Sequence, residues 1–454
     1  MLKEYIDSIK DKRVSVVGIG VSNTPLIRLL AKGGVRVTAH DKKPRDQMPE
    51  LARELEDLGV ELVLGPDYLK EITGDIVFRT PGLRPDVPAL AAARERGAEI
   101  TSEMEVFLSL CPCTVLAVTG SDGKTTTTTV ISELLKAQGY NVFVGGNIGT
   151  PLLDRTDEMT EKDFCVLELS SFQLMTMKKS PHVAVLTNIA PNHLDVHKGM
   201  EEYIASKENI FLHQSKDDIL VYNLDNDLAR NSSIRAPGHT RGFSRREHGY
   251  SYCDEKGDIY VGGELVMNAC DIRLPGVHNI ENYLAAFAAA SDYVSKGVMA
   301  DVARQFGGVE HRLEFIRELD GVRYYNDSIG TSPTRTIAGL RSFDRKVILI
   351  AGGYDKHIPF DVLGPEVIKH VSQLHLCGAT EEKIYQAVVN APGYSSENLP
   401  IFFHKDYEEM LADIRSRAHA GDIVLLSPAC AAFDRFPNFA KRGEYFKQLV
   451  NGLK

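Results

Sequence analysis

Short apolar runs alternate with longer amphipathic stretches along most of the chain. In the first block, an apolar run from Arg13 leads into Gly18 and Gly20. A helix-like stretch over Pro25–Lys32 and a second apolar run over Val35–Ala39 follow. Apolar runs of this length are typical of strands, and strands separated by helix-length segments are typical of parallel sheets. The pattern therefore predicts α/β structure in which helices wrap parallel sheets.

The same alternation continues through the rest of the chain. Thr114–Val118 is an apolar, β-branched run, and a glycine loop and a predicted helix over Thr125–Gly139 follow it. Further strands are predicted at Phe164–Leu169 and Val183–Ile189. A third block begins near Arg312, with strands predicted at Lys346–Ile350, Leu374–Cys377 and Ile423–Leu426.

Composition and charge indicate the class of protein and its location in the cell. With 43% hydrophobic and 25% charged residues the chain is an ordinary globular protein, and its formal net charge of -10 disfavours nucleic acid as a partner. Met1–Arg13 is unlike a signal peptide, and no apolar run approaches the roughly 18 residues that span a bilayer. The seven scattered cysteines indicate neither a zinc site nor a disulfide framework. We expect a cytoplasmic monomer that acts on small molecules, without membrane insertion.

The glycine loop after Val118 has the composition of a phosphate-binding loop. Backbone N–H groups and the positive end of the following helix suit phosphate oxygens, Lys124 reaches the outer phosphates, and Thr125 offers Mg²⁺ a hydroxyl. Val118 stands where the longer motif has its first glycine, so the loop is a shorter variant, T-G-x-x-G-K-T. We expect ATP to bind at Gly120, Ser121, Asp122, Gly123, Lys124, Thr125 and Thr126.

The chain length bounds the number of domains. A chain of 454 residues exceeds what one hydrophobic core sustains, so two or three domains are expected. The alternating pattern places the boundaries near residues 105 and 311. We predict an N-terminal Rossmann-like domain, a central ATP-binding domain with a P-loop-type parallel sheet, and a C-terminal Rossmann-like domain, at residues 1–105, 106–310 and 311–454.

Polar residues at predicted strand ends suggest where ligands bind. In open parallel sheets, ligands bind at the carboxyl ends of the strands. Glu168 is a candidate carboxylate there, because Mg²⁺ prefers oxygen ligands. His193 holds the equivalent place after the next strand. From the residues alone, two other interpretations stay open: Glu168 as a solvated charge at the edge of the sheet, and His193 as a structural histidine. Asp41 follows the first glycines by about 20 residues, as in dinucleotide-binding folds, but Asn23 replaces the third glycine of that fingerprint.

Seven short strings, in order along the chain, resemble the Mur ligases, the ATP-dependent enzymes that build the peptide of peptidoglycan. The resemblance spans nearly the whole chain and is closest to the branch that adds D-glutamate to UDP-N-acetylmuramoyl-L-alanine. The strings are Gly120-Ser-Asp-Gly-Lys-Thr125, Gly146-Asn-Ile-Gly149, Glu168-Leu-Ser-Ser-Phe-Gln173, His278-Asn-Ile-Glu-Asn282, Glu310-His-Arg312, Asn326-Asp-Ser328 and Leu426-Ser-Pro-Ala-Cys-Ala431.

The resemblance implies a role for each block. The first block would hold the uridine nucleotide, the second ATP with two Mg²⁺ ions, and the third, which closes over both, the incoming D-glutamate. Catalytic roles are implied for Lys124, Glu168, His193, Lys207 and Arg312. Contacts to the UDP substrate are implied for Gly20, Val21, Ser22, Asp41, Gly82, Asn147 and His193. Further ATP contacts are implied for Asn279, Asn282, Arg312 and Asp327, and amino-acid contacts for Thr331, Lys356 and Phe439.

Lys207 falls where the family has a lysine carbamylated by CO₂, although the residues alone indicate an exposed helix lysine. Carbamylation turns a cation into an anion, which helps to hold a second Mg²⁺. The implied metal ligands are Thr125, Glu168, His193 and carbamylated Lys207. In the family scheme, the substrate carboxylate attacks the γ-phosphorus of ATP, and the D-glutamate amine then displaces phosphate from the acyl phosphate.

The third block departs from the family pattern at two positions. Ile329 stands where D-S-K often has lysine, and Ala432 replaces the serine expected after P-A-C-A. The glutamate pocket must therefore use other groups.

Other functions are left open. A sister ligase would add L-alanine or a diamino acid, or add glutamate to folate, but S-P-A-C-A with Phe436, Phe439 and Arg442-Gly443 favours the D-glutamate branch. A P-loop switch ATPase normally carries the full G-x-x-x-x-G-K motif, which Val118 interrupts. A dehydrogenase is disfavoured by Asn23.

Overall fold

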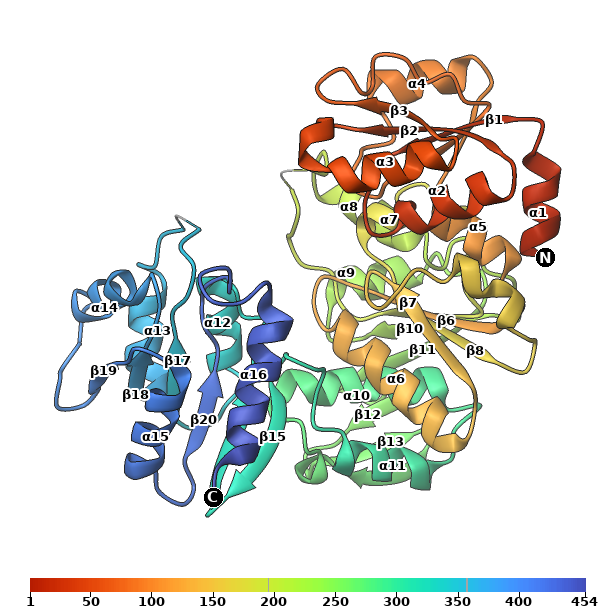
Figure 1. The fold of residues 1–454 in the computed structure, drawn as a ribbon. Helices are drawn as coiled ribbons and strands as arrows, with labels where there is room; N and C mark the ends of the chain where they lie inside the picture. Colours follow the sequence, from red (N-terminus) through yellow and green to blue (C-terminus); the bar gives the residue numbers. More distant parts are fainter. Residues whose placement is uncertain (195, 357) are drawn as a thin grey trace. The chain divides into compact units, whose positions relative to one another are not determined.

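The structure is a computed structural model that describes residues 1–194, 196–356 and 358–454. Its α/β class and its three separate sheets confirm the predicted fold class (Figure 1). The first two sheets lie in one compact unit, residues 1–269 with 281–302, and the third lies in a second unit, residues 270–280 with 303–454. The boundaries at residues 105 and 311 stay predictions.

The N-terminal sheet contains five parallel strands in a Rossmann-like order. The strands are β1 (Arg13–Val17), β2 (Arg36–Asp41), β3 (Glu61–Leu64), β4 (Ile76–Arg79) and β5 (Glu99–Thr101). The helices are α1 (Leu2–Ile9), α2 (Asn23–Lys32), α3 (Pro49–Asp57) and α4 (Pro88–Glu95), with a 3₁₀ turn at Arg45–Gln47. The order β3-β2-β1-β4-β5 brings the carboxyl ends of β1, β2 and β4 to one edge. Val16 packs with α2 on one face, and Val77 packs with α4 on the other (Figure 1).

The central sheet has nine strands. They are β6 (Thr114–Thr119), β7 (Val142–Gly146), β8 (Phe164–Glu168), β9 (Val183–Leu186), β10 (Ile219–Asn223), β11 (His239–Ser244), β12 (Ser251–Cys253), β13 (Asp258–Val261) and β14 (Glu264–Asn268). The helices between residues 103 and 305 are α5 (Glu103–Leu110), α6 (Lys124–Gln138), α7 (Ser171–Leu174), α8 (Met200–Glu208), α9 (Asp227–Ser233), α10 (Val277–Ala290) and α11 (Lys296–Gln305). Two 3₁₀ turns lie at Leu153–Glu158 and Ala269–Asp271.

The order of this sheet, β14-β13-β12-β11-β10-β9-β6-β8-β7, places β6 between β8 and β9. The strands from β7 to β12 run parallel, as predicted, and β13 and β14 form an antiparallel edge. The sequence did not predict this edge, because these two strands are only half-buried and lack a continuous apolar run. Val118 is buried inside β6, so the strand occupies the place where the longer phosphate-loop motif would begin.

The third sheet has six strands. They are β15 (Glu314–Leu319), β16 (Val322–Asn326), β17 (Val347–Ala351), β18 (Val371–Leu376), β19 (Ile401–Phe403) and β20 (Ile423–Leu426). Its helices are α12 (Pro333–Leu340), α13 (Leu363–His370), α14 (Glu381–Val389), α15 (Tyr407–Arg417) and α16 (Phe439–Gly452). In the order β15-β16-β20-β17-β18-β19, β15 pairs antiparallel with β16, and the other neighbours are parallel.

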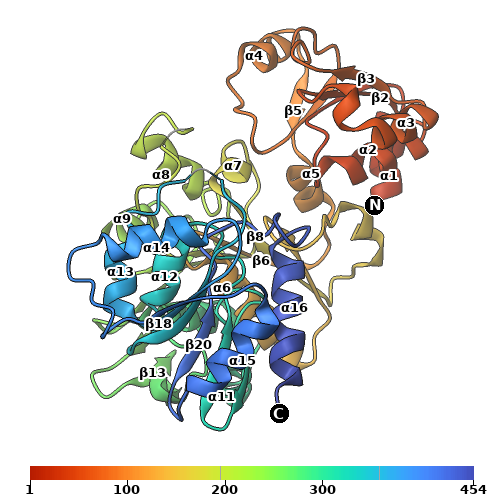
Figure 2. The same ribbon diagram turned by 60° about the vertical axis from the view of Figure 1, so that its left-hand side comes forward.

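Both faces of the third sheet are covered. Alternate residues of a strand point to opposite faces, so Leu349 and Leu425 join the core under α12 to α14, whereas Ile348 and Val424 join the core under α15 and α16 (Figure 2). Burial on both faces explains why the sequences of β17 and β20 are continuous apolar runs. Among the described helices, none combines the length and the apolar character that crossing a bilayer requires.

Gly146, at the end of β7, offers a test of how tightly β7 and β8 approach each other. Its φ is +95°, and an added Cβ would lie 2.2 Å from the Glu168 carbonyl oxygen. Gly139 has a similar φ of +104° but open space around it. We expect Gly139→Ala to lower the free energy of unfolding by about 1 kcal/mol through backbone strain, and Gly146→Ala by about 3 kcal/mol through strain and overlap. Urea unfolding followed by circular dichroism measures both, and equal losses would contradict the close approach.

Candidate active site

The glycine loop joins β6 to α6 at the carboxyl edge of the central sheet. Both of its glycines are required by close approach as well as by backbone conformation. A Cβ on Gly120 would lie 1.9 Å from Thr187 Oγ1, and a Cβ on Gly123 would lie 2.3 Å from Asn282 Oδ1. Gly123, at φ +79°, caps the first turn of α6, so backbone N–H groups and the positive helix end open toward the loop.

Ser121 and Asp122 fix the loop to the segment that follows β9. The Ser121 backbone N–H donates to the Asn188 carbonyl oxygen at 2.9 Å, and its hydroxyl donates to the Ala190 carbonyl oxygen at 2.9 Å. The same hydroxyl lies 2.9 Å from the Tyr203 hydroxyl on α8. The Asp122 backbone N–H donates to Asn188 Oδ1 at 3.0 Å. These hydrogen bonds anchor the loop backbone to the segment that follows β9 and to α8.

Two lysine side chains converge on one carbonyl group of the loop. Lys124 Nζ donates to the Gly120 carbonyl oxygen at 2.9 Å and to that of Ser121 at 2.8 Å. Lys207 Nζ, from α8, donates to the same Gly120 oxygen at 2.7 Å. Two amines at one oxygen form a site that attracts anions such as phosphate.

Lys207 is buried, with only 1% of its surface exposed, and its Nζ lies 4.7 Å from the centre of the Tyr203 ring. The interpretation of an exposed helix lysine is therefore wrong. The reason is that α8 turns this residue toward the loop, where Tyr203, one helical turn earlier, also points. Burial, and secondarily the charge of Lys124, lowers the pKa of Lys207 from 10.5 to about 7.

Glu168 ends β8 and is buried, with 2% of its surface exposed, so a solvated edge charge is also wrong. Its Oε1 accepts a hydrogen bond from Asn147 Nδ2 at 2.7 Å, and its carbonyl oxygen accepts one from the Asn147 backbone N–H at 2.7 Å. Its Oε2 is buried without a hydrogen-bond partner in the described part of the chain. A buried carboxylate oxygen without a donor is where a cation would fit.

His193 lies in the loop after β9 and is exposed, with a left-handed φ of +54°. Its ring stands edge-on to Phe172 of α7, with ring centres 5.1 Å apart. Thr125, the remaining predicted metal ligand, is half-buried on the first turn of α6.

The predicted uridine-binding residues of the first block lie at the carboxyl ends of its strands. Asp41 is the last residue of β2, Gly20, Val21 and Ser22 follow β1, and Gly82 follows β4. Asp41 is buried, and its carboxylate accepts the backbone N–H groups of Ile19 at 2.7 Å and Lys43 at 2.9 Å. The carboxylate therefore holds the loop after β1 in place. Gly20 and Gly82 are exposed with open space around them, and Val21 is 83% exposed.

Two asparagines on α10 were predicted to read adenine. Asn282 is buried, and its Oδ1 accepts a hydrogen bond from Thr127 Oγ1 at 3.3 Å, one turn into α6. Asn279 is buried as well, and its Nδ2 donates to the Pro275 carbonyl oxygen. Asn282 thus lies against the phosphate loop at Gly123 and the first turn of α6.

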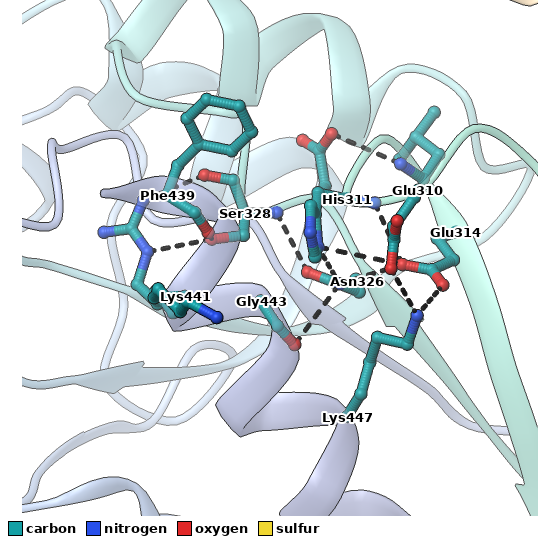
Figure 3. Close-up of polar contacts among 12 residues, drawn as sticks. Glu310, His311, Glu314, Asn326, Ser328, Phe439, Lys441, Gly443 and Lys447 are labelled. Carbon is teal, nitrogen blue, oxygen red and sulfur yellow. Dashed lines mark hydrogen bonds and ion pairs between the residues drawn. The ribbon is translucent and has the colours of Figure 1, made fainter. Parts of the chain in front are cut away.

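The third block contains a polar cluster around the strand end of β16 (Figure 3). Asn326 Nδ2 lies 3.0 Å from His311 Nδ1 and 3.0 Å from Glu314 Oε2, and the His311 backbone N–H donates to the same Glu314 oxygen at 2.9 Å. Lys447 of α16 pairs with Glu310 and Glu314. These contacts fix the strained segment at His311, whose φ is +64°, while the neighbouring Arg312 is exposed.

Arg442, one turn into α16, joins two loops of this cluster. It is 1% exposed, and its guanidinium donates to Ser328 Oγ at 3.0 Å and to the carbonyl oxygens of Ser328, Cys430 and Ala431 at 2.9, 3.0 and 3.1 Å. Ser328 Oγ in turn donates to the Phe439 carbonyl oxygen at 2.7 Å (Figure 3). One planar cation thus sets the separation of the Asn326-Asp-Ser328 and Ser427-Pro-Ala-Cys430 loops.

The remaining predicted residues of the third block lie in three places. Asp327 is buried, Ser427 Oγ donates to it at 2.7 Å, and burial raises the pKa of its carboxyl group to about 7. Lys356 Nζ donates to the Thr331 carbonyl oxygen at 3.2 Å, so these two predicted amino-acid contacts are neighbours. Phe439 begins α16 with 36% of its surface exposed.

The sequence predicted no role for Tyr203 or Asn188 among the residues that hold the site in shape, and it indicated Arg442 only as a sign of the D-glutamate branch. Tyr203 precedes Lys207 by four residues on a predicted helix, so their common face was a usable signal. Asn188 and Arg442 act from other segments, and local pattern alone does not place them.

Comparisons with known proteins identify the family of the chain. The Mur ligase middle domain matches residues 118–290, and the glutamate ligase domain of Mur ligases matches residues 311–430. UDP-N-acetylmuramoylalanine--D-glutamate ligases of Clostridium acetobutylicum and Clostridium kluyveri are 50% and 51% identical to the chain, over 99% of the chain and of each relative. The solved UDP-N-acetylmuramate-alanine ligase of Thermotoga maritima has a TM-score of 0.56 at 17% identity, covering 98% of this chain and all of that one. This structural likeness concerns the fold.

The depressed pKa of Lys207 predicts a pH dependence of stability. Between about pH 7 and 10.5 the unfolded chain binds a proton at this lysine that the folded chain does not, so the free energy of unfolding rises with pH across this window. Relative to Lys207→Met, the wild-type chain should gain about 1 kcal/mol per pH unit from pH 7 to 9. Urea unfolding of both proteins by circular dichroism, at matched pH, gives the difference. A difference that stays constant with pH would show that Lys207 titrates at its ordinary value.

The hydrogen bonds of Arg442 predict a structural cost for its removal. Arg442→Met should lower the free energy of unfolding by about 2–4 kcal/mol, because it leaves buried carbonyl groups without donors. The neighbouring Lys441 forms an exposed ion pair with Glu444, so Lys441→Met should change it by less than about 1 kcal/mol. Comparable losses in the two variants, in the same urea titration, would contradict the assigned role.

Proposed function

The chain belongs to the Mur ligase family, and we infer that it joins D-glutamate to UDP-N-acetylmuramoyl-L-alanine in an ATP-dependent reaction. It is 50% and 51% identical, over 99% of its length, to two family members that are D-glutamate ligases. The full-length identity is the observation that carries this inference, since it covers the third block as well as the ATP-binding block. The reaction is a step of peptidoglycan synthesis.

The ATP phosphates belong at the glycine loop. Its backbone, the start of α6 and the Lys124 ammonium offer N–H donors and positive charge in one place. Lys124 would leave the carbonyl groups of its own loop to bind the outer phosphates. Asn282, directly behind Gly123, supports the assignment of adenosine to the same side of the loop.

The residues around Glu168 fit Mg²⁺. The buried Oε2 of Glu168 lacks a donor in the described chain, and Thr125 supplies a hydroxyl from the first turn of α6. His193 and carbamylated Lys207 complete the proposed set of ligands. When bound, Mg²⁺ would neutralise negative charge on the phosphates.

Lys207 suits carbamylation because its pKa of about 7 leaves the amine neutral in about half of the molecules near pH 7. The neutral nitrogen attacks the carbon of CO₂, a C–N bond forms, and the amine releases a proton as the carbamate anion forms. The product carries a negative charge beside Lys124, so the repulsion between two cations becomes an attraction.

The ligation proceeds in two substitutions. A carboxylate oxygen of UDP-N-acetylmuramoyl-L-alanine attacks the γ-phosphorus of ATP, and the bond to the ADP oxygen breaks. The D-glutamate amine then attacks the acyl carbon, phosphate leaves, and the nitrogen loses a proton. Lys124 would stabilise charge on the transferred phosphoryl group, and Arg312 and Asp327 stay predicted ATP contacts.

D-Glutamate is assigned to the neighbourhood of Thr331, Lys356 and Phe439. The Lys356 ammonium offers a cation for a substrate carboxylate, which compensates for the absence of lysine at position 329. Because the side chains of Ile329 and Ala432 are apolar, backbone groups would supply the remaining polar contacts to D-glutamate. Arg442 holds those backbone groups at a fixed separation. The uridine contacts at Asp41 and its neighbours, the cytoplasmic location and the monomeric state stay predictions.

A phosphate-release assay with ATP, Mg²⁺ and UDP-N-acetylmuramoyl-L-alanine tests the proposed function. Phosphate should appear only after D-glutamate is added, and Lys124→Met should lower kcat by about 10²–10³-fold, because a donor to the transition state is lost. Lys136→Met, which removes an exposed lysine further along α6, should leave the rate unchanged. Release without any amino acid would contradict a ligase, and a response only to a diamino acid or L-alanine would indicate a sister enzyme.

A further inference from the structure

Among the described residues, one group of three side chains lies close enough together to hold a metal ion, and it is in the third sheet's unit. His375 is on β18, His404 follows β19, and Asp413 is on α15. His375 is fully buried, and His404 is 8% exposed. The proposed ligase reaction uses none of them.

The strand pairing explains how they meet. Leu374 and Leu376 face α13 and α14, so His375 between them points to the opposite face, which α15 covers. His375 pairs with Phe402 across the two strands, and His404, two residues further on, shares its face. Asp413 reaches this face from α15. The cluster therefore joins the edge strand β19 and α15 to the sheet.

The distances suit a small transition-metal ion. His375 Nδ1 lies 3.0 Å from His404 Nε2, and each nitrogen lies 3.9 Å from Asp413 Oδ2. A point equidistant from the corners of this triangle is about 2.1 Å from each atom, which matches ordinary Zn²⁺ bond lengths to nitrogen and carboxylate oxygen.

Surrounding groups orient the three side chains as supporting residues do in metal sites. Arg417 Nε donates to Asp413 Oδ1 at 2.7 Å, which leaves Oδ2 facing the imidazoles. Gln373 Oε1 lies 3.4 Å from His375 Nε2, and the Phe402 ring stacks on His375 with centres 4.9 Å apart.

We propose that His375, His404 and Asp413 form a structural site for Zn²⁺ or a similar divalent transition metal. Two imidazoles and one carboxylate favour Zn²⁺ over Mg²⁺. Side-chain shifts of about 0.5 Å would move the ion out of the plane of its three ligands, so that water completes a tetrahedron. The hydrogen carried by one of the two facing nitrogens would move to the other nitrogen of its ring, so that both facing nitrogens can bind the ion. Bound there, it ties β19 and α15 together and stabilises the unit without entering the ligation chemistry.

Cobalt substitution tests this site in the full chain. After treatment with a chelator, one equivalent of Co²⁺ should produce the visible absorption of a tetrahedral nitrogen and oxygen site, without thiolate charge-transfer bands. One equivalent of Zn²⁺ should abolish that absorption and raise the melting temperature by several degrees. His404→Gln should lose both effects. His419→Gln, at an exposed position, should keep both, as should His193→Asn in the proposed active site.

The proposal is overturned if the wild-type chain shows neither cobalt absorption nor a zinc-dependent rise in melting temperature. It is also overturned if His404→Gln, folded as judged by circular dichroism, binds cobalt like the wild type. Loss of the absorption in His193→Asn alone would assign the ion to the ligase site instead.

Discussion

Two lysine amines share a single backbone carbonyl oxygen at the end of β6, and the arrangement of the active site depends on this constraint. Lys124 and Lys207 both donate to the Gly120 oxygen, and their proximity, together with burial, is unfavourable for two full charges. The chain can relieve that cost by binding an anion, by leaving Lys207 neutral, or by converting it to a carbamate. The proposed binding of the ATP phosphates and the proposed carbamylation of Lys207 would each relieve this electrostatic cost.

The fold produces this condition through the position of one strand. Because β6 lies between β8 and β9, its carboxyl end is adjacent to Glu168 on one side and to the Asn188 segment on the other. Glu168 supplies negative charge, and Asn188 fixes the loop backbone. In the second unit, Arg442 performs a comparable task, because one guanidinium sets the separation of two loops.

Much of the fold could be predicted from the sequence, because strands buried on both faces are continuous apolar runs. The predicted strand at Ile423–Leu426 agrees in its bounds with β20, and the predicted helix from Thr125 agrees with α6 within one residue. The antiparallel edges, including β15, could not be predicted, since half-exposed strands lack that signal. The phosphate loop was recognisable because its chemistry is local. The burial of Lys207 and the contacts of Arg442 were not, because they depend on distant segments.

In the proposed reaction, the loop holds ATP while its γ-phosphoryl group passes to the substrate carboxylate. An isotope experiment tests this most directly: UDP-N-acetylmuramoyl-L-alanine labelled with ¹⁸O in its carboxylate is turned over with ATP and D-glutamate, and the released phosphate is analysed by mass spectrometry. Attack of the carboxylate on the γ-phosphorus predicts one ¹⁸O atom in each phosphate released. Unlabelled phosphate, with amide product formed at the normal rate, would contradict the acyl phosphate and with it the assigned work of the loop.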